Sequence, residues 1–155
     1  MKARLAASVA LALTVVLGGT GCSMLTYQAT TEKYDASDGV SADLGSLAVR
    51  NILLVMSEGG TDANLVFTVA NSSDEDADLE IGLADGDSQT VEVPAHGQVV
   101  LDAGDDAEEP LLIEGVDANP GDLVDLYLST DGAEGLQIPA PVLDGRLSEY
   151  RALRP

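Results

Sequence analysis

The sequence predicts an all-β fold, an antiparallel β-sandwich, for most of its length, and three observations support that class. Eight short apolar runs follow one another from residue 46 onward, spaced about a dozen residues apart. Gly, Pro, Asp and Asn occupy the breaks between them, as expected of turns between short strands. Aromatic residues make up only 3% of the chain, so the core must use the Val, Leu and Ile that strands favour.

Residues 1–21 precede this domain and are expected to be a secretory signal. Lys2 and Arg4 make its start basic, and residues 5–17 form an uncharged apolar run. A run of about 13 residues is too short to cross the ~30 Å hydrocarbon core of a bilayer, but it suits the apolar part of a signal peptide.

The only cysteine of the chain, Cys22, follows this run after four small residues. Gly19, Thr20 and Gly21 before it are small, and the segment resembles the lipobox of bacterial lipoproteins, although Gly19 stands where that motif usually has Leu. The resemblance implies cleavage between Gly21 and Cys22 and a diacylglycerol on the Cys22 sulfur. The alternatives are an ordinary cleaved signal and an uncleaved signal anchor.

Residues 22–45 are expected to be the lipidated cysteine and a flexible tether, because they lack periodicity and are rich in Ser, Thr, Asp and Gly. Such a coil reaches roughly 25–30 Å. The sandwich is placed at residues 46–142, and residues 143–155 form a C-terminal tail.

Within the sandwich, two runs show the period of two expected of half-buried strands. In DLEIGLA (78–84) every second residue is apolar. In LVDLYLST (123–130) Asp125 and Tyr127 point away from the apolar side. The expected strands are 46–56, 64–71, 78–84, 90–93, 98–101, 110–115, 123–130 and 135–142.

The tail 143–155 is expected to form one short amphipathic turn or helix, because Leu and Tyr recur in it at spacings of three and four. It could serve as a docking arm, or it could pack on the sandwich and pair its arginines with an acidic surface. We favour packing. Its apolar positions are Leu143, Leu147, Tyr150 and Leu153, and its basic positions are Arg146, Arg151 and Arg154.

The chain is strongly acidic, with a formal net charge of −20 at pH 7. Lys2 and Arg4 are two of its seven basic residues, so loss of the signal leaves five against 27 acidic residues and a net charge of about −22. Nucleic acid and anionic lipid bind through clustered Lys and Arg, so both are excluded as partners. The acidity could serve a basic partner, or it could be a solvation habit of the source organism, and we favour the second.

Four segments carry a more specific signal. LVFTVANSSDEDADL (65–79) ends a strand in Asn before an acidic turn, and VPAHGQVVL (93–101) is a Pro-Ala turn leading into a strand. Residues 109–129 give two further strands, and GLQIPAPV (135–142) gives the last. In this order the segments resemble the PCu(A)C family of periplasmic copper chaperones, within it the actinobacterial surface lipoproteins. The resemblance implies a cupredoxin-like, immunoglobulin-like β-sandwich.

The copper ligands of that family do not carry over. The resemblance implies a His-x-Met strand where residues 109–111 of this chain read Glu-Pro-Leu. The only histidine, His96, falls in a turn, and Met56 is the only methionine within the domain. Copper(I) needs several soft ligands. We therefore expect no metal and no cofactor other than the lipid on Cys22.

One acidic stretch is a weak candidate for a hard cation, although a solvated loop is the commoner outcome because capture needs convergent carboxylates. An enzyme is not expected, since a lone His96 has no recognisable nucleophile and acid beside it in the sequence. The candidate cation residues are Asp102, Asp105, Asp106, Glu108 and Glu109.

Two functions from different classes follow. In the first, the chain is a lipid-anchored, non-catalytic accessory or interaction subunit at the outer face of the cytoplasmic membrane. The resemblance to actinobacterial lipoproteins implies a large membrane complex, such as the cytochrome bcc–aa3 respiratory supercomplex, as its partner class. In the second, it is a degenerate copper or metal chaperone for a membrane oxidase.

Overall fold

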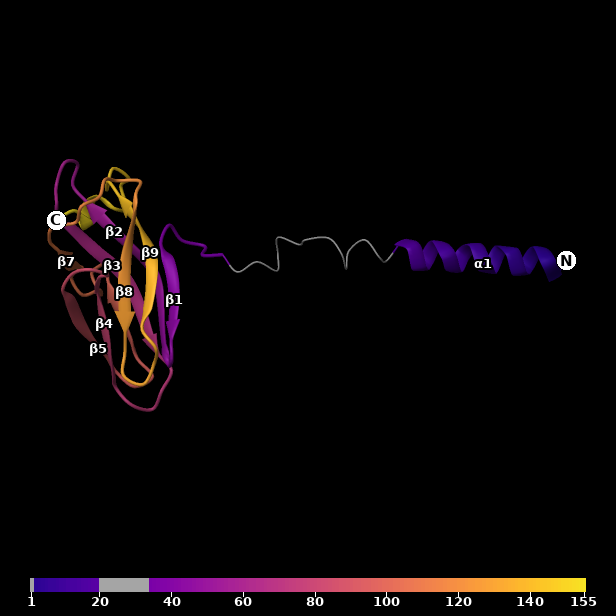
Figure 1. The fold of residues 1–155 in the computed structure, drawn as a ribbon, viewed down its shortest axis with the longest axis horizontal. Coiled ribbons are helices and arrows are strands. Elements are labelled where there is room, and N and C mark those ends of the chain that lie inside the picture. The colour runs from indigo at the N-terminus through magenta and orange to yellow at the C-terminus, as the bar shows by residue number, and fades with distance from the viewer. Residues whose placement is uncertain (1, 20–33) are drawn as a thin grey trace. The chain divides into compact units, whose positions relative to one another are not determined.

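The computed structural model describes residues 2–19 and 34–155 (Figure 1). Helix α1 spans Lys2–Gly19, within the expected signal, and no helix in the described ranges is both long and apolar enough to cross a membrane. Gly21 and Cys22, the expected cleavage and lipidation residues, lie outside the described residues. The folded domain is the compact unit Asp35–Pro155.

All eight apolar runs expected to be strands are strands. The bounds differ by one to two residues at most ends, because the end of a strand depends on individual hydrogen bonds that a local sequence pattern does not locate. The strands are β2 (Leu47–Met56), β3 (Ala63–Asn71), β4 (Ala77–Leu83), β5 (Ser88–Val93), β6 (Gln98–Leu101), β7 (Leu111–Ile113), β8 (Leu123–Ser129) and β9 (Leu136–Leu143).

A further strand, β1 (Val40–Leu44), corrects the expected boundary between tether and sandwich. It pairs antiparallel with β2 through a tight connection at Gly45, whose φ of 55° suits the left-handed turn. Ala42 and Leu44 are buried in the core. The tether boundary at residue 45 was therefore wrong, because a short strand among Ser, Asp and Gly has little signal of its own and is stabilised by pairing.

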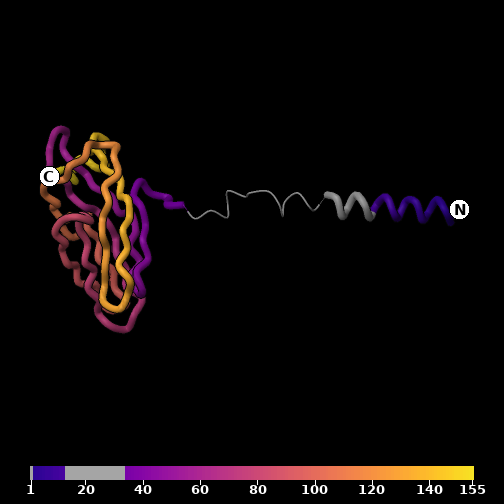
Figure 2. The backbone as a smooth tube through the Cα atoms, in the orientation of Figure 1, coloured from indigo at the N-terminus to yellow at the C-terminus, as the bar shows by residue number. Residues whose placement is uncertain are grey.

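The strands form one continuous sheet, in the order β5-β4-β8-β9-β2-β3-β6, that folds into a sandwich. We call the layer of β1, β2, β3, β6 and β7 sheet A, and the layer of β4, β5, β8 and β9 sheet B. Figure 2 follows β8 through one turn into β9. The all-β sandwich class is confirmed, with one departure: β2 and β9 pair in parallel, joining Leu54 to Val142.

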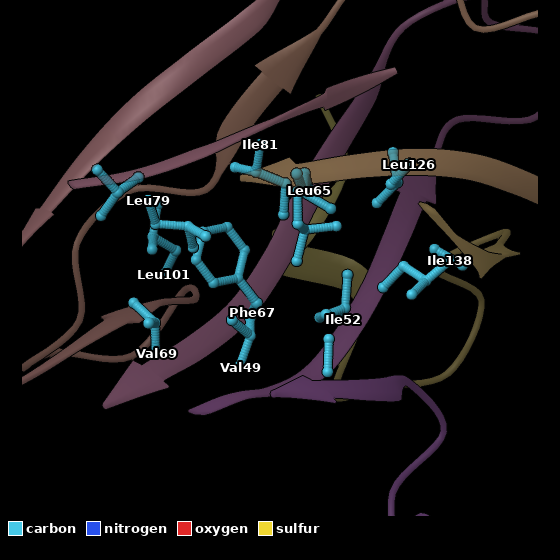
Figure 3. Packing of buried hydrophobic residues seen from close by; sticks show 14 of the residues in the cluster. Val49, Ile52, Leu65, Phe67, Val69, Leu79, Ile81, Leu101, Leu126 and Ile138 are labelled. Atoms are coloured by element: carbon cyan, nitrogen blue, oxygen red, sulfur yellow. The ribbon is translucent and has the colours of Figure 1, made fainter. Parts of the chain in front are cut away.

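The core between the layers is aliphatic apart from Phe67, the only phenylalanine of the chain. Figure 3 shows its ring among Val49, Val69 and Leu101, and Leu79 and Ile81 of sheet B belong to the same buried cluster. Burial of a side chain of this size contributes about 1.5–3 kcal/mol relative to exposure. The expectation of a core made of Val, Leu and Ile is borne out.

The C-terminal tail packs on the outer side of sheet A, as the favoured interpretation has it. Leu153 is buried with Val55 and Val66, and its carbonyl oxygen accepts a hydrogen bond of 3.1 Å from the Asn64 side-chain amide. The expected short turn is a 3₁₀ helix over Arg151–Leu153. The tail thus covers a second apolar cluster that the sandwich would otherwise expose.

The three arginines of the tail differ in their ion pairs. Arg146 forms ion pairs with Glu58 at 3.0 Å and with Asp144 at 3.1 Å. Arg151 and Arg154 form no ion pair within 4 Å in the described part of the chain. The expected pairing of the tail with acidic residues therefore holds for Arg146.

The tail is also linked to the segment that precedes β1. The Tyr150 hydroxyl donates a hydrogen bond of 2.6 Å to the Asp38 carboxylate. This bond, with smaller contributions from burial and nearby carboxylates, raises the pKa of Tyr150 to about 12. The neutral phenol is the bonded form, so the bond stabilises the fold below the ordinary tyrosine pKa of 10.0 and is lost as the pH rises through about 12.

We expect a spectroscopic titration of the tyrosines to show one phenol ionising near pH 12. Asp38→Asn removes the anionic acceptor and should shift this phase downward, while Tyr150→Phe should abolish it. Asp35→Asn is the matched control, because Asp35 accepts from the Ser41 backbone amide instead. A late phase that survives Asp38→Asn would contradict the link.

Candidate functional site

The place where the resemblance implies copper ligands is the approach to β7. Leu111 opens this strand and pairs with Leu65 of β3. Glu109 is exposed and Pro110 is half-buried just before it. The segment therefore lies at an edge of sheet A, and it offers one carboxylate and no soft donor.

A cleft of about 700 Å³ lies beside this segment, where β5 of sheet B faces β6 and β7 of sheet A. Three carboxylates line it, and the remaining side chains are apolar except for one threonine. Carboxylate oxygens are hard donors and do not suit copper(I). The lining residues are Thr90, Val91, Glu92, Pro94, Leu101, Glu108, Glu109 and Leu111.

The two soft donors of the domain lie at opposite ends of β3. Met56 ends β2 opposite Ala63, the first residue of β3, and is only 1% exposed. His96 lies in the β5–β6 turn, where its backbone amide bonds the Ser73 carbonyl just beyond the end of β3. A nine-residue strand spans roughly 25–30 Å. His96 and Met56 therefore cannot share a metal ion.

The His96 side chain has a structural partner. Its Nε2 lies 2.8 Å from the Asp74 Oδ1, and its φ of 53° places it in the left-handed region at the tip of the turn. The imidazole is 64% exposed. It bridges two loops at one end of the sandwich, and this accounts for its geometry.

The acidic candidate residues lie on the loop between β6 and β7. The loop is closed by backbone hydrogen bonds between Asp102 and Glu108, at 3.1 Å, and between Glu108 and Val100, at 2.8 Å. The Asp102 carboxylate accepts from the Ala103 amide at 2.7 Å. All five candidates are exposed, and among the residues the structure describes no three His, Cys, Asp or Glu side chains are grouped to hold a metal ion.

Part of this loop borders a second cleft, of about 590 Å³, between the loop and the end of the tail. Asp102 and Glu109 line it together with Ala152 and Pro155. The structure brings these two carboxylates to one cleft. Cation binding by the acidic stretch stays a prediction.

The outward side of sheet B is a surface that sequence reasoning missed. We define the sheet B face by Asp78, Glu80, Glu92, Leu123, Asp125 and Tyr127, all of which are exposed. The strands β4, β5, β8 and β9 contain four acidic residues and no Lys, Arg or His. Asp78 and Glu92 stand directly opposite each other across the β4–β5 ladder.

The other half of the sheet B face carries exposed apolar side chains around Asp125. Leu123 is 65% exposed and Tyr127 is 44% exposed, and both lie on β8 with Asp125 between them. On the neighbouring strand Pro139 is exposed opposite Asp125. The alternation along residues 123–130 predicts Asp125 and Tyr127 on the outward side, and the structure adds Leu123 to that side.

Like charges directly opposite in a sheet destabilise it. Glu92→Gln should therefore raise the free energy of unfolding by about 0.2–1 kcal/mol in urea denaturation at low salt. Asp117→Asn is the control, because it also removes one charge from an exposed position but lies in a loop. An equal gain for both variants, or a difference that persists in 1 M salt, would contradict a local repulsion.

Comparison with known proteins places the fold. No family model and no curated protein matches the sequence. The copper-bound PCuAC domain from PmoF2 matches in structure with a TM-score of 0.52 and 18% identity, over 67% of this chain and 97% of that domain. The apo PmoF2 PCuAC domain matches with a TM-score of 0.55 and 16% identity, over 70% and 98%. The suspected resemblance is thus confirmed at the level of the fold: this chain folds as a PCuAC-like β-sandwich.

Proposed function

We propose that this chain is a non-catalytic, lipid-anchored domain of PCuAC fold that works by contact, as an accessory subunit at the outer face of the cytoplasmic membrane. One observation carries the proposal. The fold is kept, but the cleft at the expected ligand strand is lined by Glu92, Glu108 and Glu109 and by no sulfur or imidazole. Copper(I) requires soft donors, so the surface of the domain is left as its means of action.

A second candidate is a copper chaperone, and the likeness to a copper-bound PCuAC domain favours it. This likeness supports a copper-chaperone type of domain more directly than it supports any respiratory partner. The residues at the expected ligand strand, 109–111, offer no soft donor, however. The two soft donors of the domain do not meet either, because Met56 is buried and His96, bonded to Asp74, lies about one strand length from it. Copper carriage would need donors from elsewhere.

The non-catalytic character of the proposal is supported by the surroundings of His96, the only histidine. Its Nε2 faces Asp74, so the arrangement has an imidazole and an acid. Ser73 is the nearby hydroxyl residue, but its contact with His96 is a backbone one, in which its carbonyl accepts from the His96 amide. The Ser73 hydroxyl donates to the Asn71 side chain and not to the imidazole. Nucleophilic catalysis requires a hydroxyl or thiol that is hydrogen-bonded to its base, and His96 has no such partner among the described residues.

The partner class is proposed from the resemblance to actinobacterial lipoproteins. An acyl chain on Cys22 would hold the domain close to the bilayer, where large membrane complexes such as the cytochrome bcc–aa3 supercomplex present their outer surfaces. The strongly acidic domain would meet such a complex through basic patches.

Copper loading separates the two candidates. After anaerobic incubation with Cu(I) and removal of excess metal by a chromophoric chelator, we expect far less than one copper per chain, because the cleft offers only oxygen donors. The PmoF2 PCuAC domain is the positive control. Retention of one Cu(I) per chain would replace the contact proposal with the chaperone. Co-purification with oxidase subunits in mild detergent, without copper, would support contact.

The anchor has its own test. Cys22→Ala removes the acyl acceptor, and we expect the protein to move from the membrane fraction to the medium, because the acyl chains supply most of the membrane affinity. Ser23→Ala, next to it, should leave the protein membrane-bound. A Cys22→Ala protein that stays membrane-bound at full length would show an uncleaved signal anchor.

A further inference from the structure

We propose that the sheet B face is a docking surface for a protein that presents Lys and Arg side chains beside an apolar patch. The inference rests on the contact function proposed above and adds the surface and the chemistry of the partner. Three features of the molecule lead to it: the distribution of charge, the exposed apolar residues of β8, and the covering of the opposite face.

Charge is distributed unequally between the two layers. The folded domain has four basic residues, Arg50 on β2 and the three arginines of the tail that packs on sheet A. Sheet B has none in its strands. Its outward side therefore presents acidic groups without internal neutralisation.

Two of those acidic groups are held in an unfavourable arrangement. Asp78 and Glu92 are direct cross-strand neighbours, and both are exposed. Glu80 lies on the same side of β4, and its carboxylate accepts a hydrogen bond of 2.9 Å from the Ser129 hydroxyl rather than an ion pair. A partner that brings Lys or Arg to this corner relieves the repulsion, which gives both attraction and orientation.

In the half of the face that carries apolar side chains, the Tyr127 ring is held in place by its neighbours. Tyr127 lies over Gly135, and a side chain at Gly135 would collide with the phenol, so the ring rests directly on the backbone of the β8–β9 turn. A ring held in this way loses little conformational entropy when it is covered, and tyrosine is enriched in protein interfaces. Leu123 and Pro139 extend the apolar surface beside it.

The opposite outer surface is already occupied. The tail covers the outward side of β2 and β3 with Leu153 and Tyr150. Within residues 34–155 no segment is placed in the same way on sheet B, where Leu123 and Tyr127 stay exposed. The chain thus shields one outer face itself and presents the other.

The mode of binding follows from β9. Pro139 and Pro141 have no N–H to donate, so this part of β9 is a poor template for an added strand. At β9 a partner would therefore contact side chains rather than add a strand, and the proposed docking does not use the free edge of β5, the terminal strand of sheet B. A second copy of this chain is disfavoured, since two acidic faces repel each other.

Photo-crosslinking in intact membranes of the source cells tests the surface. A photoreactive benzoylphenylalanine replaces Leu123 in the full-length chain, and in a matched protein it replaces Leu147, which is similarly exposed at 57% but lies on the tail. We expect a discrete adduct from position 123 and none from position 147. The crosslinked partner peptide should be rich in Lys and Arg, and 0.5 M NaCl before irradiation should lower the yield several-fold.

Charge reversal provides the second arm. With the photoreactive residue at 123, Asp125→Lys should reduce the adduct about tenfold, whereas Asp117→Lys, off the face, should change it less than about twofold. Asp125→Asn is the milder variant if Asp125→Lys lowers the amount of folded protein.

The outcomes separate the inference from the function on which it rests. An adduct from position 147 alone would overturn the sheet B face and leave the contact function standing. No adduct from either position would overturn the sheet B face, whereas the contact function falls only if co-purification with oxidase subunits fails as well. A crosslink to a second copy, or to a peptide without basic residues, would overturn the proposed partner chemistry.

Discussion

Strand β2 is shared by the two layers, and the arrangement of the domain depends on this. It pairs with β3 from Leu47 to Met56 and with β1 mainly along its first half, and near its end Leu54 and Val55 pair in parallel with β9. Because β2 is buried on both sides, with Leu53 and Val55 facing the tail and Leu54 facing the core, it ties sheet B, sheet A and the C-terminal tail together.

From this strand comes the difference between the two outer faces. Near the end of β2 the outward residues Leu53 and Val55 are apolar and require a cover, which the tail supplies through Leu153. The outward residues of sheet B include exposed acidic and apolar side chains that have no such cover in residues 34–155. A single domain can therefore present one face to a partner while its own chain protects the other.

This chain shares the β-sandwich of the PCuAC domains but has carboxylates in the cleft beside β7. The sandwich tolerates carboxylates in the cleft where copper(I) donors are expected, because that cleft lies at an open seam between β5 and β7 and not in the packed core. Loss of soft ligands there leaves the core around Phe67 intact. The PCuAC-like fold thus does not require soft side chains in this cleft.

The sequence by itself determined the eight strands of the apolar runs, because local alternation and turn residues specify them. It also determined the scarcity of soft ligands, since the one histidine of the chain and the one methionine within the domain are counted without coordinates. Only the tertiary structure decided that β1 joins the sandwich, that β2 and β9 pair in parallel, and that Asp78 meets Glu92. These depend on strand register and on pairing between distant segments, which local patterns do not encode.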